Sequence, residues 1–506
     1  MDPVTLCILI PFVSALACLA CWQTPALQRG MSVAGMVALL GNALWLLSEV
    51  WHRGILVVKV GNWEAPFGIS LVADMLSSIM VLVTAITGLA VVVYSLAEID
   101  AGRERYGYYG FLQFMLMGVC GAFLTGDIFN MFVWFEVMLI SSFVLMALGG
   151  ELRQMEGAVK YVVLNLISSS LFLAACGILY GKIGTLNLAD LALRVGDMLD
   201  PALLTVTAAL FLVAFGLKAG LFPLFFWLPA SYHTPPVAVS AIFAGLLTKV
   251  GVYAMIRIFT LVFTKDVEFI HTLLLALAGL TMLTGVLGAV VQFDFRRLLS
   301  FHIISQIGYM ILGLALFTPL AIAGTVFYIF HHIIVKSNLF LISGVAHRYS
   351  GTFDLKKLGG LLKASPFLAI LFFIPAMSLG GIPPLSGFFA KFAIVKAGLA
   401  GDTIFEGAAA WLVGIALAVG LLTLFSMTKI WAEAFWKQPD PAALPNPESV
   451  PLREKILLLG PIVALALVTI SIGLMPEFFF AFAMRAAEEL LNPNLYIEAV
   501  LGVTRR

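Results

Sequence analysis

The sequence carries unusually little charge. Only 11% of its 506 residues are Asp, Glu, Lys or Arg, whereas a soluble domain carries roughly 25%. The formal net charge is +1, and the chain has no basic patch or zinc-ligand spacing, so we predict no nucleic-acid binding. Hydrophobic residues make up 61% of the chain and give a mean hydropathy of +1.05. This composition predicts an all-α polytopic membrane protein.

Cysteine is also scarce, and no cysteine indicates a disulfide, cluster or metal site. All five cysteines fall in apolar segments, where neither a disulfide framework nor an iron–sulfur cluster is expected: Cys7, Cys18, Cys21, Cys120 and Cys176. Cys18 and Cys21 form a CxxC, but no second pair completes a tetrahedral metal site. We therefore assign the cysteines packing roles and predict neither a metal nor a cofactor.

The N-terminus, MDPVTLCILIPF, lacks the basic segment and the small-residue cleavage site of a signal peptide. We expect the first apolar segment to be retained as a helix. Apolar stretches long enough to span a bilayer, about 20 residues each, recur along the whole chain. We predict about fourteen transmembrane helices, near residues 3–22, 30–50, 71–97, 107–125, 127–149, 157–181, 203–229, 237–259, 270–290, 295–315, 319–346, 364–399, 406–433 and 453–475.

Three connecting segments have recognisable local structure. Residues 51–70 mix β-branched and turn residues, which predicts a short hairpin over the outer face. The Pro-rich residues 437–452 predict an extended cytoplasmic strap. The segment after Pro476 has an apolar face and predicts a helix along the outer interface. None of the three carries a catalytic motif.

Basic residues gather on alternate loops, which predicts the orientation of the chain. One set of loops holds Arg29, Arg103, Arg105, Arg153, Arg296, Arg297, Arg348, Lys356, Lys357, Lys363, Lys437, Arg453 and Lys455. The opposite set holds only Arg53, Lys59, Lys182, Arg194 and Lys265. The first set should be cytoplasmic, so both termini are expected on the outer side of a bacterial cytoplasmic (inner) membrane.

One apolar segment, Phe211–Pro236, carries Lys218 in its middle and Pro223 five residues later. A charge at this depth costs about 2.5–3.5 kcal/mol even on the lenient insertion scale, so Lys218 should face protein or water. Because proline lacks an N–H and clashes with the carbonyl four residues back, we expect a break near Pro223. The alternative is a proline kink with a lysine that reaches the interface.

The same combination recurs at Met377–Lys396, where Pro383 and Pro384 interrupt an apolar segment and Lys391 follows. Two discontinuous helices five crossings apart run in opposite directions, which predicts two inverted five-helix repeats. We expect four regions, namely helices 1–3 in residues 1–100, the first inverted repeat in 101–262, the second in 263–436, and the Pro-rich linker, helix 14 and interfacial helix in 437–506.

Further charged residues lie in the middle of apolar segments. Glu136 stands among Phe and Trp residues of the fifth predicted helix and needs a partner, for which Lys218 is the obvious candidate. Lys249 lies halfway along the eighth helix. His332 and Lys336 are four residues apart in the eleventh and hence share a face.

Other polar residues give weaker signals. His331 points away from His332 and is more simply explained by packing or hydrogen bonding. Groups that could hold water are His302, Gln306, Tyr309 and Ser168 to Ser170. The acids Asp74 and Asp127 each lie close to a helix end.

Five strings occur in order along the chain: GLKAGLFPLFFWLP, AIFAGLLTKVGVYAMIR, QFDFRRLLSFHIISQIGYM, HHIIVKSNLFLISG and GIPPLSGFFAKF. They resemble the proton-conducting family shared by Mrp-type cation/proton antiporters and the antiporter-like subunits of respiratory complex I. The resemblance covers the fourth to thirteenth predicted helices. The stretch GNWEAPFGISLVADMLS, the overall length, and Lys391, where another branch has an acidic residue, are most similar to the D-subunit branch of the Mrp antiporters.

The resemblance implies roles for six residues in proton translocation. Glu136 and Lys218 match the ion pair of the family, Lys249 its bridging lysine, His332 and Lys336 its relay, and Lys391 its terminal gate. Two positions depart from the family: His302 stands where many relatives have Tyr, and SYHTPP replaces the commoner loop after the seventh helix.

Charge counting leads to a similar mechanism without the family. Four central lysines face one central carboxylate, Glu136. Because burial and like charges both disfavour the charged form of a lysine, at least one should be neutral and able to accept a proton. A proton could then pass from Lys218 to Lys249, and along His332 and Lys336 to Lys391.

We therefore expect an ion-transporting subunit rather than an enzyme. It should move protons, coupled to sodium or another cation, within a larger complex of membrane subunits in the lipid bilayer. Three alternatives remain: a proton-pumping subunit of a complex I-type NADH:quinone oxidoreductase, a membrane scaffold without transport, and a self-contained carrier of organic solutes. The row of charges favours ion transport over the carrier, whose charges would surround one pocket.

Overall fold

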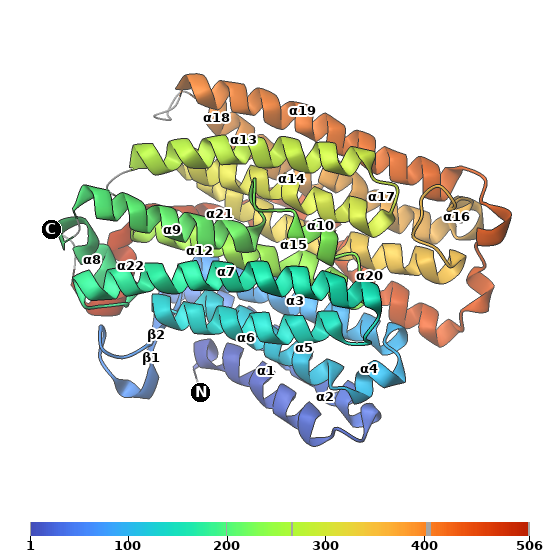
Figure 1. Cartoon of the computed structure of the whole chain (residues 1–506), viewed down its shortest axis with the longest axis horizontal. Helices are drawn as coiled ribbons and strands as arrows, with labels where there is room; N and C mark the ends of the chain where they lie inside the picture. Colours follow the sequence, from blue (N-terminus) through green and yellow to red (C-terminus); the bar gives the residue numbers. More distant parts are fainter. Residues whose placement is uncertain (1, 199, 265–266, 401–405, 504–506) are drawn as a thin grey trace.

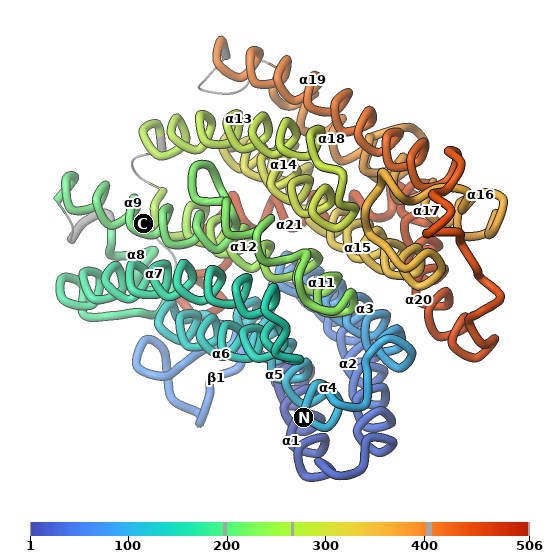
Figure 2. The backbone as a smooth tube through the Cα atoms, turned by 45° about the vertical axis from the view of Figure 1, so that its right-hand side comes forward, coloured from blue at the N-terminus to red at the C-terminus, as the bar shows by residue number. Residues whose placement is uncertain are grey.

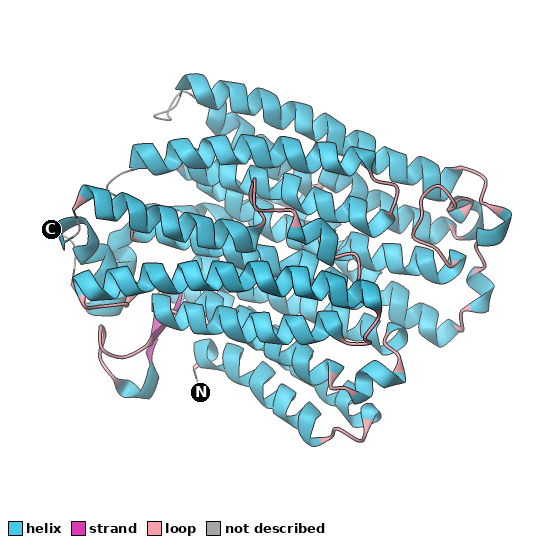
Figure 3. Cartoon of the chain, in the orientation of Figure 1, coloured by secondary structure: helices cyan, strands magenta, loops and turns pink. Residues whose placement is uncertain are grey.

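The structure is a computed structural model that describes residues 2–198, 200–264, 267–400 and 406–503. Lys265, one of the lysines in the orientation argument, lies outside the described residues. Figure 3 shows that helix makes up almost the whole chain, with the two strands together at one corner. The all-α membrane architecture expected from the sequence is confirmed.

Within the described residues, twelve helices are long and apolar enough to cross a membrane, and two shorter apolar helices, α5 and α17, accompany them. The long elements are α1 (Pro3–Ala20), α2 (Pro25–Arg53), α3 (Met75–Glu98), α5 (Tyr108–Leu124), α6 (Ile128–Ala147), α7 (Leu152–Ile183), α9 (Pro201–Ala219), α11 (Val237–Ile242) continuing through η2 (Phe243–Leu247) into α12 (Thr248–Leu261), α13 (Val267–Val291), α14 (Phe295–Leu316), α15 (Pro319–Ser350), α17 (Pro366–Gly380), α18 (Ser386–Leu399), α19 (Glu406–Ile430) continuing into η3 (Trp431–Trp436), and α20 (Leu452–Leu474).

Short elements connect and cap these helices. They are β1 (Leu56–Lys59), η1 (Val60–Asn62), β2 (Ser70–Ala73), α4 (Ala101–Arg105), α8 (Leu188–Met198), α10 (Trp227–Ser231), α16 (Leu361–Ala364), η4 (Pro441–Ala443), η5 (Pro447–Ser449), α21 (Pro476–Leu491) and α22 (Pro493–Leu501). The predicted hairpin is present, although it sits further along the chain: β1 pairs antiparallel with β2, and Leu56 lies opposite Ala73.

Helix starts are marked by local hydrogen bonds. At α3 the Asp74 carboxylate accepts from the Ser77 N–H at 2.9 Å, and the Ser77 hydroxyl accepts from the Asp74 N–H at 2.9 Å. Such a reciprocal cap satisfies donors that the first helical turn leaves unpaired. Asp127, Asp294 and Thr318 each cap a later helix with a side-chain oxygen. The polar residues that interrupt the apolar sequence therefore set where these helices begin.

Both predicted interruptions are present, but the first lies earlier than Pro223. Helix α9 ends at Ala219, and Gly220 follows in the left-handed conformation with φ of 83°. Glycine adopts this conformation without a Cβ clash and commonly ends helices. Lys218 consequently lies in the last turn of α9, not in the middle of a helix. Gly381, with φ of 89°, ends α17 in the same way.

Figures 1 and 2 show the helices packed side by side, with α1 and α2 at one edge and α13 and α19 at the opposite edge. Both termini lie at the same end of the bundle (Figure 1). In the most apolar 18-residue windows, 100% of residues are buried in the Val237–Leu261 helix and 94% in α14 and in α15, against 28% in α1. The inner helices can therefore shelter charge from lipid.

The C-terminal segment after Pro476 is helical, as predicted. Helix α21 packs against α15 and α3, and its Ala483, Ala486 and Ala487 are fully buried. This helix thus covers inner helices that carry charged residues.

Candidate functional site

Four of the basic residues expected to move protons are almost completely enclosed by the inner helices. Lys218 is 4% exposed, and Lys249, His332 and Lys336 are 0% exposed. Lys391 is half-buried. These five, with Glu136, are the residues singled out from the sequence, and they come from α6, α9, α12, α15 and α18.

Lys218 has a hydrogen-bond partner from a neighbouring helix. Its Nζ donates to the Ser169 Oγ of α7 at 3.2 Å and lies 5.3 Å from the centroid of the Phe135 ring of α6. The hydroxyl and the aromatic face offset part of the cost of burying an ammonium. The sequence indicated Ser168 to Ser170 only as a site for water, so the role of Ser169 as a direct partner comes from the structure.

Glu136 does not contact Lys218 directly in this arrangement. Within the described chain no ion pair joins the two residues. Lys218 bonds to Ser169 instead. The buried Glu136 Oε1 has no hydrogen-bond partner there. The carboxylate still acts on Lys218 electrostatically. The two groups therefore interact at longer range than a direct ion pair in this structure.

Lys249 follows a local widening of its helix. Residues Phe243–Leu247 form a π-helical turn, in which backbone bonds reach one residue further back than in an α-helix. In a regular helix the Ala244 carbonyl would accept from the Thr248 N–H. Here the Lys249 Nζ donates to the Ala244 oxygen at 2.5 Å. The π turn was not expected from the sequence, since such turns leave no clear pattern.

His332 and Lys336 lie on α15 with no hydrogen-bond partner among the described residues. Both ring nitrogens of His332 and the Lys336 Nζ are buried and unpaired. Lys249 acts electrostatically on both side chains. His331, one residue earlier, instead bonds to the Ser386 Oγ at 2.7 Å, in line with its expected hydrogen-bonding role.

Lys391 binds the end of the second broken helix. Its Nζ donates to the carbonyl oxygens of Leu379 at 2.9 Å and of Gly380 at 3.3 Å, and it lies 5.0 Å from the centroid of the Tyr309 ring. These carbonyls are left over because α17 ends there. A cavity of about 360 Å³ adjoins the lysine and is also lined by apolar residues of α18 and α19.

Aromatic and polar side chains occupy the space between Lys391 and His332. Tyr309 stacks on Tyr328 with ring centroids 5.4 Å apart, and Tyr328 lies 6.4 Å from the His332 ring. The Tyr328 hydroxyl donates to the Gln306 Oε1, and His302 bonds to the Ser426 Oγ. Tyr328 was missed from the sequence, although its position four residues before His332 places both on one helical face.

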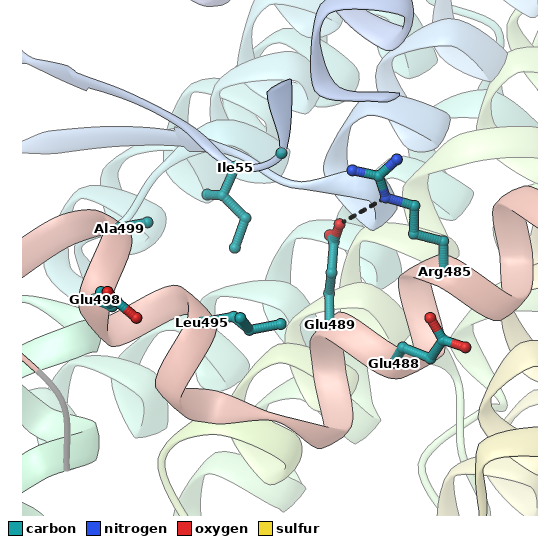
Figure 4. Close-up of a pocket in the computed structure, with 8 residues that line it drawn as sticks. Ile55, Arg485, Glu488, Glu489, Leu495, Glu498 and Ala499 are labelled. Carbon is teal, nitrogen blue, oxygen red and sulfur yellow. Dashed lines mark hydrogen bonds and ion pairs between the residues drawn. The ribbon is translucent and has the colours of Figure 1, made fainter. Parts of the chain in front are cut away.

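A separate pocket of about 440 Å³ lies between α21, α22 and the residues Gly54 and Ile55 (Figure 4). Glu488, Glu489 and Glu498 line it, and Arg485 pairs with Glu489. No group of three His, Cys, Asp or Glu that could hold a metal ion occurs in the described part of the chain. The central row of buried basic residues is the candidate functional site, because the inner helices enclose it.

Known proteins are similar to this chain over almost its whole length. The sequence profile described as NADH:quinone oxidoreductase/Mrp antiporter, TM, matches residues 125–427. The D-subunit of the Na(+)/H(+) antiporter of Alkalihalophilus pseudofirmus is 50% identical over 98% of this chain and 99% of its own. The protein of the same name from Bacillus subtilis is 43% identical over the same shares.

Solved structures agree with these relatives. A chain of the Mrp complex from Dietzia sp. DQ12-45-1b has a TM-score of 0.91 and 33% identity, covering 99% of this chain and 100% of that one. A chain of respiratory complex I from Thermus thermophilus has a TM-score of 0.80 at 24% identity, covering 96% and 99%, and shares the fold. The resemblance noted in the sequence is confirmed: the chain belongs to the NADH:quinone oxidoreductase/Mrp antiporter transmembrane family.

Proposed function

We propose that this chain is the proton-translocating subunit of a multisubunit Na⁺/H⁺ antiporter in a bacterial cytoplasmic membrane. The curated relatives are named as antiporter subunits, and the Dietzia chain comes from an Mrp complex. Protons would move along Glu136, Lys218, Lys249, His332, Lys336 and Lys391. Partner subunits would share the exchange of H⁺ for Na⁺, and both termini would face the outside.

One observation carries this proposal: His332 and Lys336 are fully buried and have no hydrogen-bond partner among the described residues. An unpaired buried polar group is costly, and stability alone would favour its replacement by an apolar residue. Groups that must accept and release protons need free lone pairs or donors. Their position between Lys249 and Lys391 supports a role as the relay.

The mechanism follows from the separation of the charges. When Glu136 and Lys218 approach, the pair stabilises the charged ammonium, and when they separate, burial favours loss of its proton. A proton leaving Lys218 can pass to Lys249, whose charge disfavours charge on Lys336 and His332. These successive local changes would drive a proton toward Lys391. The discontinuous helices would give each half of the row flexible backbone at membrane depth.

We also propose that residues 101–262 and 263–436 are two inverted repeats, after the first three helices in residues 1–100. The matching ends of α9 and α17 at left-handed glycines support this division. Residues 437–506 then form the linker, helix α20 and the terminal helices. Each repeat would contribute one broken helix to the proton path.

The test is sodium-dependent proton exchange in everted vesicles that contain the complete complex, followed with a fluorescent pH probe. Glu136→Ala and Lys218→Ala should each abolish exchange, while the chain level and the complex on native gels stay near wild type. Lys160→Ala is the control, because Lys160 is exposed and pairs with Glu156 one turn earlier on α7. Exchange above half of the wild-type rate in either test variant would refute the proposal.

A redox-driven complex is the second candidate. A chain of the membrane-bound sulfane sulfur reductase, an archaeal respiratory membrane complex, has a TM-score of 0.89 and 27% identity over 98% of this chain and 99% of that one. Purification of the native complex separates the two candidates. Copurifying quinone-reducing or sulfur-reducing subunits would favour the redox-driven complex, and their absence from an active exchanger would favour the antiporter.

A further inference from the structure

Acidic side chains at the two ends of α3 contact the two ends of the helix that carries Lys249. At one end, the Glu98 carboxylate accepts hydrogen bonds from the backbone N–H groups of Val237 at 2.5 Å and of Ala238 at 2.8 Å. These are the first residues of the Val237–Leu261 helix, whose early N–H groups have no partner within the helix. A carboxylate there is favoured both by the hydrogen bonds and by the helix dipole.

At the other end, Asp74 pairs with Arg257. The Arg257 Nη1 lies 2.6 Å from the Asp74 Oδ2, and the two side chains are only 4% and 3% exposed. The Arg257 Nη2 also donates to the Tyr253 hydroxyl at 3.1 Å, which in turn donates to the Phe123 carbonyl at 2.6 Å. Breaking a buried pair of this kind leaves an uncompensated charge, so the contact is a firm anchor.

The C-terminal helix α21 in turn contacts the residue next to Asp74. Glu489 of α21, shown beside Arg485 in Figure 4, accepts a hydrogen bond from the Met75 N–H at 2.8 Å. Asp74 and Met75 are adjacent, so the C-terminal helix secures the start of α3 next to the Arg257 pair. Both ends of α3 therefore make hydrogen bonds or ion pairs with other helices.

The π turn lies between the two anchors and is closely packed. A Cβ at Gly245 would lie 2.3 Å from the Ser337 Oγ of α15 and 3.6 Å from the Thr87 Cγ2 of α3. The Ser337 Oγ also donates to the Ala241 carbonyl at 3.1 Å. The turn therefore sits between α3 and α15, and a side chain at its centre would have to displace the Ser337 hydroxyl.

A π turn amounts to one extra residue in a helix. To return to a regular α-helix, one flank must rotate by about 100° and shift by about 1.5 Å relative to the other. That movement would give the Ala244 carbonyl back to the Thr248 N–H and take it from Lys249. While α3 holds both flanks, neither can rotate.

We propose that Asp74 and Glu98 are positioning residues, which together clamp the Lys249 helix at both ends and so maintain the π turn that supplies the carbonyl partner of Lys249. This inference rests on the proposed role of Lys249 in proton transfer. It predicts that the effects of substituting Asp74 and Glu98 on exchange are not additive. Release of either end is enough to let the turn relax, so release of the second end has little left to change.

The test measures maximal sodium-dependent exchange in everted vesicles for Asp74→Asn, Glu98→Gln and the double variant, at matched levels of assembled complex. Each single substitution should lower the rate roughly tenfold, the effect of one charged hydrogen bond. The double variant should be no slower than the slower single variant. Independent structural effects would instead multiply to about a hundredfold loss. That outcome, or near wild-type exchange in either single variant, would overturn the clamp.

Glu104→Gln is the matched control. Glu104 is also buried at 1% exposure and pairs with Arg29 at 2.7 Å, but its partner lies on α2. Because Glu104 does not contact the Lys249 helix, Glu104→Gln alone should leave exchange near the wild-type rate, unlike Asp74→Asn and Glu98→Gln. If Asp74→Asn fails to accumulate, Tyr253→Phe replaces it in the cycle, because it removes a hydroxyl that supports Arg257.

Two further variants complete the design. Arg257→Lys keeps a cation opposite Asp74 and should retain at least half of the wild-type exchange. The proposal requires this result, because the charge pair with Asp74 is preserved. Lys249→Met separates this inference from the proposed function. Normal exchange in Lys249→Met would refute the role of Lys249, whereas a multiplicative double variant with an inactive Lys249→Met would refute the clamp alone.

Discussion

The ammonium of Lys391 lies 2.9 Å from the carbonyl oxygen of Leu379, so a lysine on α18 satisfies the end of α17. The first broken helix is completed differently. There the Trp227 Nε1 of α10 donates to the Leu217 carbonyl of α9 at 3.0 Å, and Lys218 bonds to another helix. At the first interruption a neutral indole therefore donates to the carbonyl near the helix end, and at the second a titratable ammonium does so. Proton loss from Lys391 would weaken contact across its interruption, which suits a terminal gate.

Lys391→Leu should reduce exchange at least roughly tenfold, because the charged donor to two carbonyls is lost. Lys391→Arg should retain more activity, since a guanidinium still donates to the Leu379 and Gly380 oxygens, although it does not give up its proton readily. Lys396→Leu, on the exposed side of the same helix, should behave as wild type. Vesicle exchange rates at equal protein level measure all three, and an active Lys391→Leu would remove this residue from the path.

Ser169→Ala should lower exchange several-fold, since it removes the one side-chain hydrogen bond that the Lys218 ammonium makes to the described residues. Ser170→Ala is the natural comparison, because the Ser170 hydroxyl is exposed and donates to the Leu166 carbonyl of its own helix. The measurement is the exchange rate against external pH. Equal behaviour of the two variants would mean that Ser169 does not act on Lys218.

Asp74 makes stability sensitive to acid. Burial raises the pKa of this carboxyl, but the Arg257 guanidinium and the hydrogen bonds from Ser77 outweigh burial and hold it below the ordinary value of 3.8. A lowered pKa in the folded state means that the ionised carboxylate stabilises the fold above pH 3.8, and that this contribution is lost as the pH falls further.

Asp74→Asn in detergent should therefore have a lower Tm than wild type at pH 7, and the difference should narrow below pH 3.8. Asp127 gives the control, since burial raises the pKa of its carboxyl and its ionised form adds no such stability. Thermal unfolding at several pH values decides the matter. A Tm difference for Asp74→Asn that is constant across this range would contradict the pair as its source.

The isolated chain should insert and fold but should not exchange sodium for protons. Sodium prefers several oxygen ligands, and in the described structure the central row offers one carboxylate, Glu136, beside basic groups. The purified chain can be reconstituted in liposomes with an imposed pH gradient and a pH probe. Sodium-dependent dissipation by the chain alone, absent in Lys218→Ala, would show that no partner is needed.

Much of this architecture is encoded locally. The lengths of the apolar runs predicted the membrane crossings, and the two segments with Gly, Pro and Lys predicted the broken helices, because each signal resides within a few turns of one helix. Local signals also identified Lys218 and Lys249 as charges far from the membrane interface, and Lys391 as the lysine that follows the second interruption. The position of the first break was less accurate, since Gly220 ends the helix before Pro223 can.

What the sequence by itself determined is therefore the set of crossings, the interruptions and the central basic residues. Only the tertiary structure decided which groups meet: Ser169 with Lys218, Asp74 with Arg257, and Glu98 with the start of the Lys249 helix. These contacts join helices far apart in the chain, so no periodicity within one helix contains them. The π turn before Lys249 belongs with them, because packing between α3 and α15 and the anchors at its two ends maintain it.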